Sequence, residues 1–294
     1  MTYTTNKEKL GLLLILLVLA AAPLLAWRRH DPQTLRNLLV SYSGLGLLVR
    51  PKSYYKSRGV TIYCGDCKDI LPTLPRESVD MVWTDPPYGN NNQQGDLADQ
   101  LNRARGAKSR PIANDSRKHA MRIVDLMLDE SAGLLKRVGC CCVCSSGGGG
   151  ANGPMFAWLA NRLDADGLTF CHCVIWDKKN PGLGWRYRRR YEMVMVAHRM
   201  HGRLSWADPS IAVPNIICCS APHRRCHPNE KPESLVEQFI QVHTRPGDLI
   251  LDPFMGSGTT LLVARRLGRR AIGIELEEQY CRTAVERIEA CARN

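Results

Sequence analysis

Apolar and polar positions change their spacing at about residue 60. From there, short apolar runs alternate with segments in which apolar residues recur every three or four positions. The first kind is typical of buried strands and the second of amphipathic helices. Strands are predicted at 60–66, 79–85, 139–145, 169–178, 191–198, 248–254 and 271–275. Helices are predicted at 117–136, 154–167, 233–243, 259–268 and 278–292. Such alternation predicts an α/β fold, with a mostly parallel sheet and helices on both faces.

The first 58 residues follow a different pattern. Residues Leu10 to Trp27 carry no charge and are flanked by Lys and Arg. This run is close to the roughly 20 residues that cross a bilayer. We therefore predict an N-terminal extension, 1–58, with an apolar helix, before a domain at 59–294. A helix packed on the domain, a membrane anchor and an export signal all remain open for this run.

Composition limits the class of protein. Of 294 residues, 44% are hydrophobic and 23% are charged, which is enough for a real core and excludes disorder as the dominant state. The net charge is +12, so an acidic partner such as nucleic acid is expected. Nine Lys and Arg against two acids give +7 in residues 1–58, which leaves only +5 for the rest.

The chain has thirteen cysteines. Most of them lie in the predicted strands, where a thiol acts as a small apolar side chain, so we expect reduced thiols in a cytoplasmic protein and no metal site. One alternative stays open. A zinc site could be formed by His223, Cys226 and His227 with Cys218 or Cys219.

Two strand ends carry candidate chemistry. After the strand at 79–85, an acid, two prolines and an aromatic ring follow one another, Asp85-Pro86-Pro87-Tyr88. After the strand at 248–254, Gly256-Ser257-Gly258 precedes a helix, and the next strand ends in Glu275. Glycines between a strand and a helix permit a tight turn and close approach of a ligand, and an acid on the next strand suits the hydroxyls of a ribose. No Gly-Lys-Ser/Thr follows, which disfavours a phosphate-binding loop.

These motifs resemble those of the amino-methylating, S-adenosylmethionine-dependent DNA methyltransferases in their β motif order. The resemblance rests on DPPY at 85–88, DPFMGSGTT at 252–260, HPNEKPESLVEQFI from His227, and YCGDCKDIL from residue 63. It covers about residue 60 to the C-terminus, and the tract at 174–198 is similar to phage and prophage members. The resemblance implies a Rossmann-like class I methyltransferase fold, S-adenosylmethionine as cofactor and double-stranded DNA as substrate. Because the family's adenine enzymes usually begin the tetrapeptide with Asp, Asp85 favours transfer to adenine N6 over cytosine N4.

The resemblance also implies roles for single residues. The catalytic residues are Asp85, Pro86, Pro87 and Tyr88. The cofactor-binding residues are Asp66, Asp252, Phe254, Gly256, Ser257, Gly258, Thr259, Glu275 and Lys231. For Asp66 a helix-capping role is the alternative, and for Lys231 an ordinary surface position.

The chemistry explains why such a tetrapeptide is needed. The lone pair of an exocyclic amine is delocalised into the ring, so the amine is a poor nucleophile. Two acceptors, the Asp85 carboxylate and the Pro86 carbonyl, would hold its two N–H bonds. Tyr88 would stack on the flipped base, an interaction worth roughly 1–3 kcal/mol.

A basic segment is the candidate DNA contact. Its members are Lys178, Lys179, Arg186, Arg188, Arg189 and Arg190, and the loops 90–118 and 178–226 are the expected recognition elements. The interval 199–226 is too short for a separate recognition domain, so short target recognition, dimerisation to a homodimer, or reading by loop 90–118 is expected. An N4-cytosine enzyme, an inactive DNA-binding relative and a membrane-tethered enzyme are the rival hypotheses.

Overall fold

The computed structural model describes residues 51–89, 116–145, 155–181, 188, 190–210, 212–222 and 230–291. The chain divides into two units, 1–50 and 51–294, and the description concerns the second. Its helices are α3 (Cys67–Ile70), α5 (Arg117–Leu134), α6 (Met155–Leu163), α7 (Glu233–His243), α8 (Thr259–Arg266) and α9 (Glu278–Ala290), with a 3-10 turn at Leu71–Thr73. Its strands are β1 (Tyr55–Ser57), β2 (Val60–Cys64), β3 (Val79–Thr84), β4 (Leu135–Ser145), β5 (Leu168–Asp177), β6 (Tyr191–Arg199), β7 (Arg203–Leu204), β8 (Ile216–Cys218), β9 (Leu249–Asp252) and β10 (Arg270–Glu275).

The described strands form one sheet in the order β1-β2-β10-β9-β3-β4-β6-β5-β8, with β7 paired to β4. Its centre, β2, β10, β9, β3 and β4, is parallel throughout. Strand β1 runs antiparallel to β2, and β6 runs antiparallel to both β4 and β5. The predicted α/β fold with a mostly parallel sheet is therefore confirmed.

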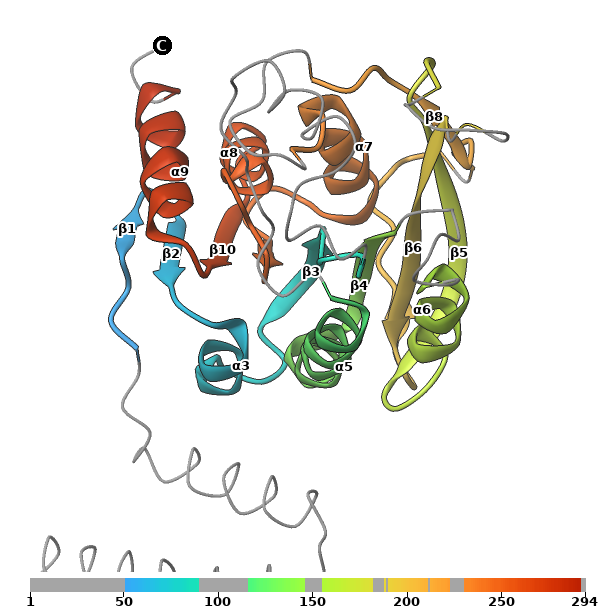
Figure 1. Ribbon diagram of the computed structural model, residues 1–294, viewed down its shortest axis with the longest axis horizontal. Helices are drawn as coiled ribbons and strands as arrows, with labels where there is room; N and C mark the ends of the chain where they lie inside the picture. Colours follow the sequence, from blue (N-terminus) through green and yellow to red (C-terminus); the bar gives the residue numbers. More distant parts are fainter. Residues whose placement is uncertain are drawn as a thin grey trace, which may run out of the picture. The chain divides into compact units, whose positions relative to one another are not determined.

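Helices cover both faces of this sheet, as Figure 1 shows, with α3, α5 and α6 on one face and α7, α8 and α9 on the other. The strands are apolar on both sides because both sides are covered. In β3, Met81 and Trp83 pack under α7, while Val82 packs toward α5. The cysteines of β4 divide in the same way. Cys140, Cys142 and Cys144 face α7, Cys141 faces α5, and all of them are free thiols.

Three strands and the short helix α3 were not predicted, and four of the predicted helices end two to four residues earlier than predicted. Strands β1, β7 and β8 have three residues or fewer, too few for a period to be read. The helix predicted to reach residue 136 stops at Leu134, because Leu135 is already extended and pairs with Val79 of β3. Strand β1 lies inside the stretch 1–58 that was assigned to an extension, so the sheet begins earlier than the sequence pattern indicates.

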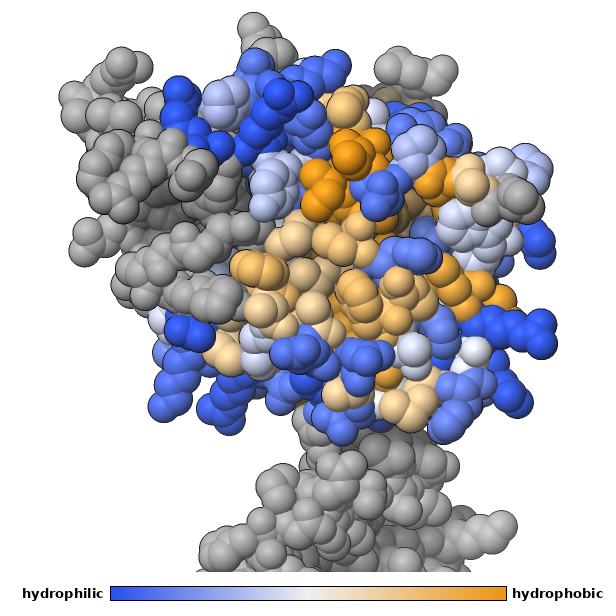
Figure 2. Space-filling model, turned by 90° about the vertical axis from the view of Figure 1, so that its right-hand side faces the viewer, coloured by the Kyte–Doolittle hydropathy of each residue, from blue (hydrophilic) through white to orange (hydrophobic). Residues whose placement is uncertain are grey.

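At the far edge of the sheet, apolar side chains remain uncovered by the described residues. Ile216 of β8 is 56% exposed and Val213 is 40% exposed. Figure 2 looks onto this side of the molecule and shows apolar residues gathered between polar ones. Within the described ranges, no helix has the length and hydropathy to cross a membrane. The apolar run from Leu10 to Trp27 lies outside those ranges.

Candidate functional site

Four acidic side chains lie at the carboxyl ends of neighbouring parallel strands. Asp66 and Asp85 follow β2 and β3, and Asp252 and Glu275 end β9 and β10. Because these strands are adjacent in the sheet, their ends meet at one edge. The chain leaves β3 toward β4 and leaves β9 toward β10, in opposite directions. The ends of β3 and β9 thus form a topological switch point, where ligands of open α/β sheets bind.

Asp85 is the centre of a hydrogen-bonded cluster. Its Oδ2 accepts a bond from Nζ of Lys231 at 2.5 Å, and its Oδ1 accepts one from the Tyr88 hydroxyl at 2.5 Å. Burial raises the pKa of the Asp85 carboxyl, although Lys231 opposes this effect. Burial alone would lower the pKa of Lys231, but the carboxylates of Asp85 and Glu192 raise it. Lys231 is only 8% exposed, so the surface-lysine alternative is wrong.

Sequence reasoning missed a second carboxylate in this cluster, Glu192 of β6. Its Oε2 lies 3.2 Å from Nζ of Lys231 and accepts a bond from the Tyr88 hydroxyl at 3.3 Å. Its Oε1 accepts a bond from Nζ of Lys178 at 3.0 Å. Burial would raise the pKa of Glu192, but the two ammonium groups lower it to about 2. One signal was available: Glu192 directly precedes the apolar run 193–197 of β6, and a charged residue is rarely buried without a partner.

The glycine turn connects β9 to α8. Gly256 and Gly258 have φ of 50° and 79°, in the left-handed region that favours glycine. A Cβ on Gly258 would also lie 2.7 Å from the Cβ of Ala284 in α9. The two glycines therefore bring the turn against α9 and leave its backbone at the edge of the sheet beside Asp85.

Two acids fix the shape of this turn. Asp252 is 3% exposed; its Oδ2 accepts a bond from the Thr260 hydroxyl at 2.5 Å, and its Oδ1 accepts one from N–H of Phe254 at 3.1 Å. Burial raises the pKa of Asp252 to about 7. Glu275 accepts bonds from N–H of Gly256 at 3.0 Å and of Glu277 at 2.8 Å. Each Glu275 oxygen thus has one lone pair occupied and another available for a ligand.

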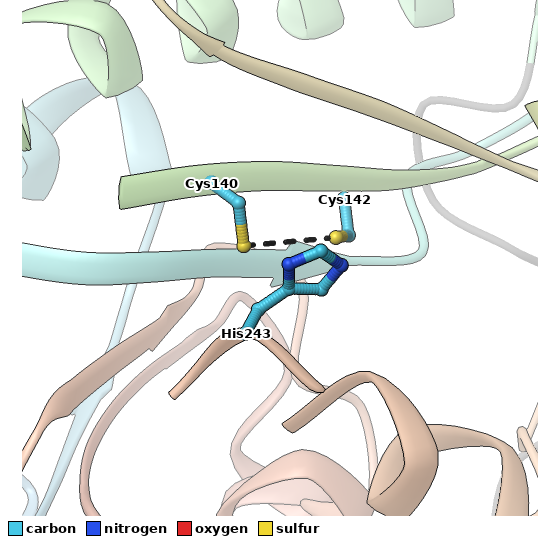
Figure 3. A group of neighbouring side chains, drawn as sticks. All are labelled: Cys140, Cys142 and His243. Carbon is cyan, nitrogen blue, oxygen red and sulfur yellow. Dashed lines mark hydrogen bonds between the residues drawn. The ribbon is translucent and has the colours of Figure 1, made fainter. Parts of the chain in front are cut away.

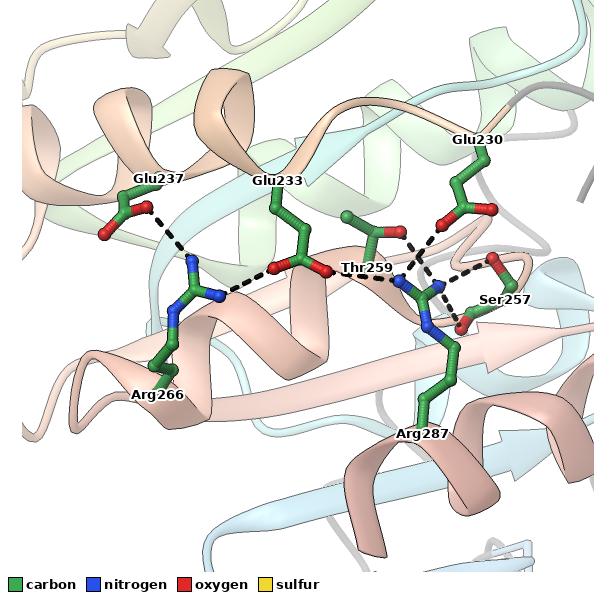
Figure 4. A network of polar contacts seen from close by, with 7 residues as sticks. All are labelled: Glu230, Glu233, Glu237, Ser257, Thr259, Arg266 and Arg287. Carbon is green, nitrogen blue, oxygen red and sulfur yellow. Dashed lines mark hydrogen bonds and ion pairs between the residues drawn. The ribbon is translucent and has the colours of Figure 1, made fainter. Parts of the chain in front are cut away.

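Arg287 of α9, a second residue that sequence reasoning missed, holds the turn from the other side. Its Nη1 donates to the carbonyl and hydroxyl of Ser257, at 3.0 and 2.9 Å, and to the Thr259 hydroxyl at 3.1 Å. Its Nη2 lies 3.0 Å from Glu230, one residue before Lys231. Figure 4 shows this arginine between the turn and the segment that enters α7. Ser257 and Thr259 are 2% and 7% exposed, so their hydroxyls serve the turn itself.

Asp66 caps α3. Its side chain accepts a bond from N–H of Lys68 at 3.0 Å and pairs with the Lys68 ammonium at 2.8 Å. Asp66 therefore has the helix-capping role that was the alternative to cofactor binding. Asp66 still lies near the other acids, because N–H of the preceding Gly65 donates to the Glu275 carbonyl at 2.8 Å.

One cavity of about 40 Å³ is lined by Asp85, the first residue of the tetrapeptide, and by the glycine turn. Asp85 and Lys231 line it together with Asp252, Phe254 and the backbone of Gly256. Ser257 and Thr259 also contribute to its wall. The tetrapeptide and the glycine turn, 167 positions apart from Asp85 to Asp252 in the sequence, therefore open onto the same side of the sheet.

The predicted DNA-binding residues do not share one environment. The Lys178 ammonium is bonded to Glu192 and directed into the cluster around Asp85. Arg190 is bidentate on Asp177, at 2.7 and 2.6 Å, and Arg188 donates to the Pro181 carbonyl at 3.3 Å. Lys179 is exposed. Arg186 and Arg189 lie outside the described residues, as do most of loop 90–118 and the suggested zinc ligands His223, Cys226 and His227.

Comparisons with known proteins agree with this geometry. Residues 206–286 match a family described as DNA methylase. The chain is 28% identical over 260 residues to the Type II methyltransferase M.HinfI of Haemophilus influenzae, covering 80% of this chain and 69% of that protein. It is 28% identical over 277 residues to the Type II methyltransferase M2.DpnII of Streptococcus pneumoniae, covering 87% of this chain and 98% of that protein.

Solved structures are similar over most of the chain. A crystal structure of an M1.HpyAVI–SAM complex superposes with a TM-score of 0.57 at 26% identity, covering 78% of this chain and 99% of that one. The PvuII DNA methyltransferase, described as cytosine-N4-specific, gives a TM-score of 0.64 at 22% identity, covering 82% and 93%. At 22% identity, the similarity to the PvuII enzyme shows only a shared fold.

Proposed function

We propose that the chain is an amino-methylating DNA methyltransferase that transfers a methyl group from S-adenosylmethionine to the N6 amine of adenine in DNA. The observation that carries this proposal is the shared cavity of Asp85 and Gly256. Methyl transfer requires donor and amine to face each other across one crevice. Support for adenine over cytosine N4 comes from Asp85 at the first position of the tetrapeptide.

The residues around the glycine turn fit an adenosyl cofactor. S-adenosylmethionine, when bound, supplies an activated methyl group on a sulfonium. The Glu275 carboxylate is oriented by two backbone N–H groups and has acceptor capacity for two ribose hydroxyls. Phe254 and Gly256 would line the cofactor's path, with Asp66, Asp252, Ser257, Gly258 and Thr259 shaping it.

Asp85 and Pro86 would orient the amine. Each Asp85 oxygen already accepts one hydrogen bond, from Lys231 or from Tyr88, and keeps a second lone pair for an amine N–H. The Pro86 carbonyl would accept the other N–H, and the fixed φ of Pro86 and Pro87 limits how far that carbonyl can turn. The Tyr88 ring would then stack on the flipped base.

The proton balance assigns a second role to Asp85. An amine nitrogen that bonds to the methyl carbon as the carbon–sulfur bond breaks would take over the positive charge, leave a neutral thioether, and then have to release a proton. Asp85 can accept that proton because burial raises the pKa of its carboxyl. Glu192 would remain ionised, with its pKa at about 2, and would keep Lys231 charged after Asp85 is neutralised.

Four of the predicted basic residues remain candidates for DNA contacts, and two of them, Arg186 and Arg189, lie outside the described residues. Lys179, Arg186, Arg188 and Arg189 are the proposed phosphate contacts. Lys178 is more useful as the counter-ion of Glu192, and Arg190 as the partner of Asp177.

The oligomeric state and the location of the protein are proposed on separate grounds. A homodimer is supported by the uncovered apolar side chains at the β8 edge. A cytoplasmic location is supported by the need for a cytoplasmic cofactor. An inactive DNA-binding relative is disfavoured, because Asp85, Tyr88 and the glycine turn are all in place.

The test is methyl transfer to plasmid DNA by the full chain with isotope-labelled S-adenosylmethionine, followed by nucleoside analysis. We expect labelled N6-methyladenine, at least a hundredfold loss in Asp85→Ala, and near-normal transfer in Glu286→Ala, which removes an exposed carboxylate of α9. Labelled N4-methylcytosine would favour the alternative specificity. Undiminished transfer by Asp85→Ala would refute the catalytic assignment.

A further inference from the structure

Two cysteines and a histidine converge on the face of the sheet that α7 covers. Cys140 and Cys142 lie two positions apart on β4, so their side chains point to the same side. His243 is the last residue of α7 and faces them (Figure 3). The two sulfurs and a ring nitrogen of His243 all lie within 4.8 Å of one another. Cys140 and Cys142 are fully buried and His243 is 4% exposed.

The spacing is close to that of a metal site. The two sulfurs are 3.9 Å apart. Two thiolates on a tetrahedral zinc ion, with Zn–S of about 2.3 Å, lie roughly 3.8 Å apart. The ring nitrogen would need to be about 3.5 Å from each sulfur. Because the ligand atoms lie within 4.8 Å of one another, the imidazole would have to approach by at most about 1.3 Å. A side chain at the end of a helix can make such a movement.

The histidine is already oriented as a metal-binding histidine is. Its Nδ1 lies 2.7 Å from the Ser205 carbonyl, which can only accept, so Nδ1 carries the proton and Nε2 is left with its lone pair. Metal-bound imidazoles characteristically donate their other N–H to a carboxylate or a backbone carbonyl. The Ser205 hydroxyl also donates to the His243 carbonyl at 2.6 Å. His243 is therefore held by two hydrogen bonds to Ser205, one through its ring and one through its backbone.

Charge and access indicate which ion fits. Two thiolates and a dication form a neutral group, whereas a monovalent ion would leave one negative charge in an apolar core. His243 also lines a cavity of about 740 Å³ between α7 and β8, so an ion could approach the site from the side of the imidazole. We propose that Cys140, Cys142 and His243 bind a zinc ion that joins β4 to α7.

This site is separate from the proposed catalytic cluster. Cys144 lies further along β4. Burial raises the pKa of its thiol, and the charges of Asp85 and Lys231 also act on it. Cys140 and Cys142 lie earlier in the strand. The zinc ion would therefore be structural. It would fix α7, which follows directly on Lys231, against the sheet.

The first test measures zinc in the full chain after equilibration with excess zinc and gel filtration. The background is a chain in which the exposed Cys64, Cys218 and Cys291 are changed to serine, so that the exposed thiols of the described residues do not contribute. We expect about one zinc per chain, and with cobalt a thiolate-to-metal charge-transfer band. Less than about a tenth of an equivalent, with no band, would overturn the proposal.

Matched variants locate the ion. Cys140→Ser and His243→Gln should lose at least tenfold in zinc affinity. Cys141→Ser, equally buried but on the opposite face of the same strand, should keep it. Equal loss in Cys141→Ser would reject these ligands. As a measurement independent of the variants, zinc should raise the unfolding temperature of the background chain by several degrees, and no rise would also contradict the proposal.

Discussion

At the scale of single residues, the carboxylate of Glu192 has the clearest pH signature. Its pKa in the folded chain, about 2, lies below its ordinary value of 4.5. Its ionisation therefore stabilises the fold fully above about pH 4.5, and this stabilisation is lost as the pH falls toward 2. We expect Glu192→Gln to lower the free energy of unfolding by about 1–3 kcal/mol at pH 6, and by less than half as much at pH 3.

Urea unfolding at the two pH values measures this difference. Glu286→Gln, which changes an exposed carboxylate of α9, serves as the control and should have little effect at either pH. An equal loss from Glu192→Gln at both pH values would show that the side chain acts through packing rather than through its charge.

The same residue shows where sequence reasoning stops. Asp85, Tyr88 and Gly256 could be predicted because each belongs to a short contiguous motif, and the residue types in that motif indicate its chemical role. For Glu192 the sequence offers only the signal of a charge beside an apolar run, and its partners could not be inferred because they are remote in sequence; its contact with Tyr88 spans 104 positions. Arg287 could not be predicted as a site residue, because an arginine in the last turn of an amphipathic helix is usually a solvated side chain.

At the scale of elements, the approach of α9 to the glycine turn depends on one missing methyl group. A Cβ at Gly258 would meet Ala284 at 2.7 Å while φ is 79°. We expect Gly258→Ala to destabilise the fold by about 2–4 kcal/mol, from contact and backbone strain together. At Gly247, φ is 90° but no atom lies within 4 Å of a built Cβ, so Gly247→Ala should cost only about 1–2 kcal/mol.

A double-mutant cycle measures the contact separately. Ala284→Gly should recover part of the loss in the Gly258→Ala background, and none of the loss in the Gly247→Ala background. Additivity in both pairs would mean that α9 is free to move away from the turn.

Long elements were predictable, and short ones were not. The helix at 233–243 matches α7 residue for residue, because its apolar positions repeat over three turns. Strands β1 and β8 have three residues each and exist because a neighbouring strand supplies hydrogen-bonding partners. The start of β4 was missed because Lys136 and Arg137 interrupt its apolar pattern; Lys136 is accommodated by an ion pair with Asp80 at 2.8 Å.

At the scale of the whole molecule, β1 is the first element of the sheet among the described residues. Residues 55–57 pair with β2, and N–H of Tyr54 donates to the Ile62 carbonyl at 2.8 Å. The Tyr55 hydroxyl also bonds to Glu289 of α9. A chain starting at residue 60 would lose these contacts and turn β2 into an exposed edge strand, which promotes aggregation. A chain starting at residue 51 keeps them.

We therefore expect the chain from residue 60 to be about 2 kcal/mol less stable than the chain from residue 51, which lowers its unfolding temperature by roughly 4–8 °C. Thermal unfolding with light scattering would measure both stability and aggregation. Tyr55→Phe in the longer chain removes only the hydroxyl contact, so it should account for a minor part of the difference. Equal unfolding temperatures for the two chains would mean that β1 contributes nothing to stability and that the sheet is complete from β2 onward.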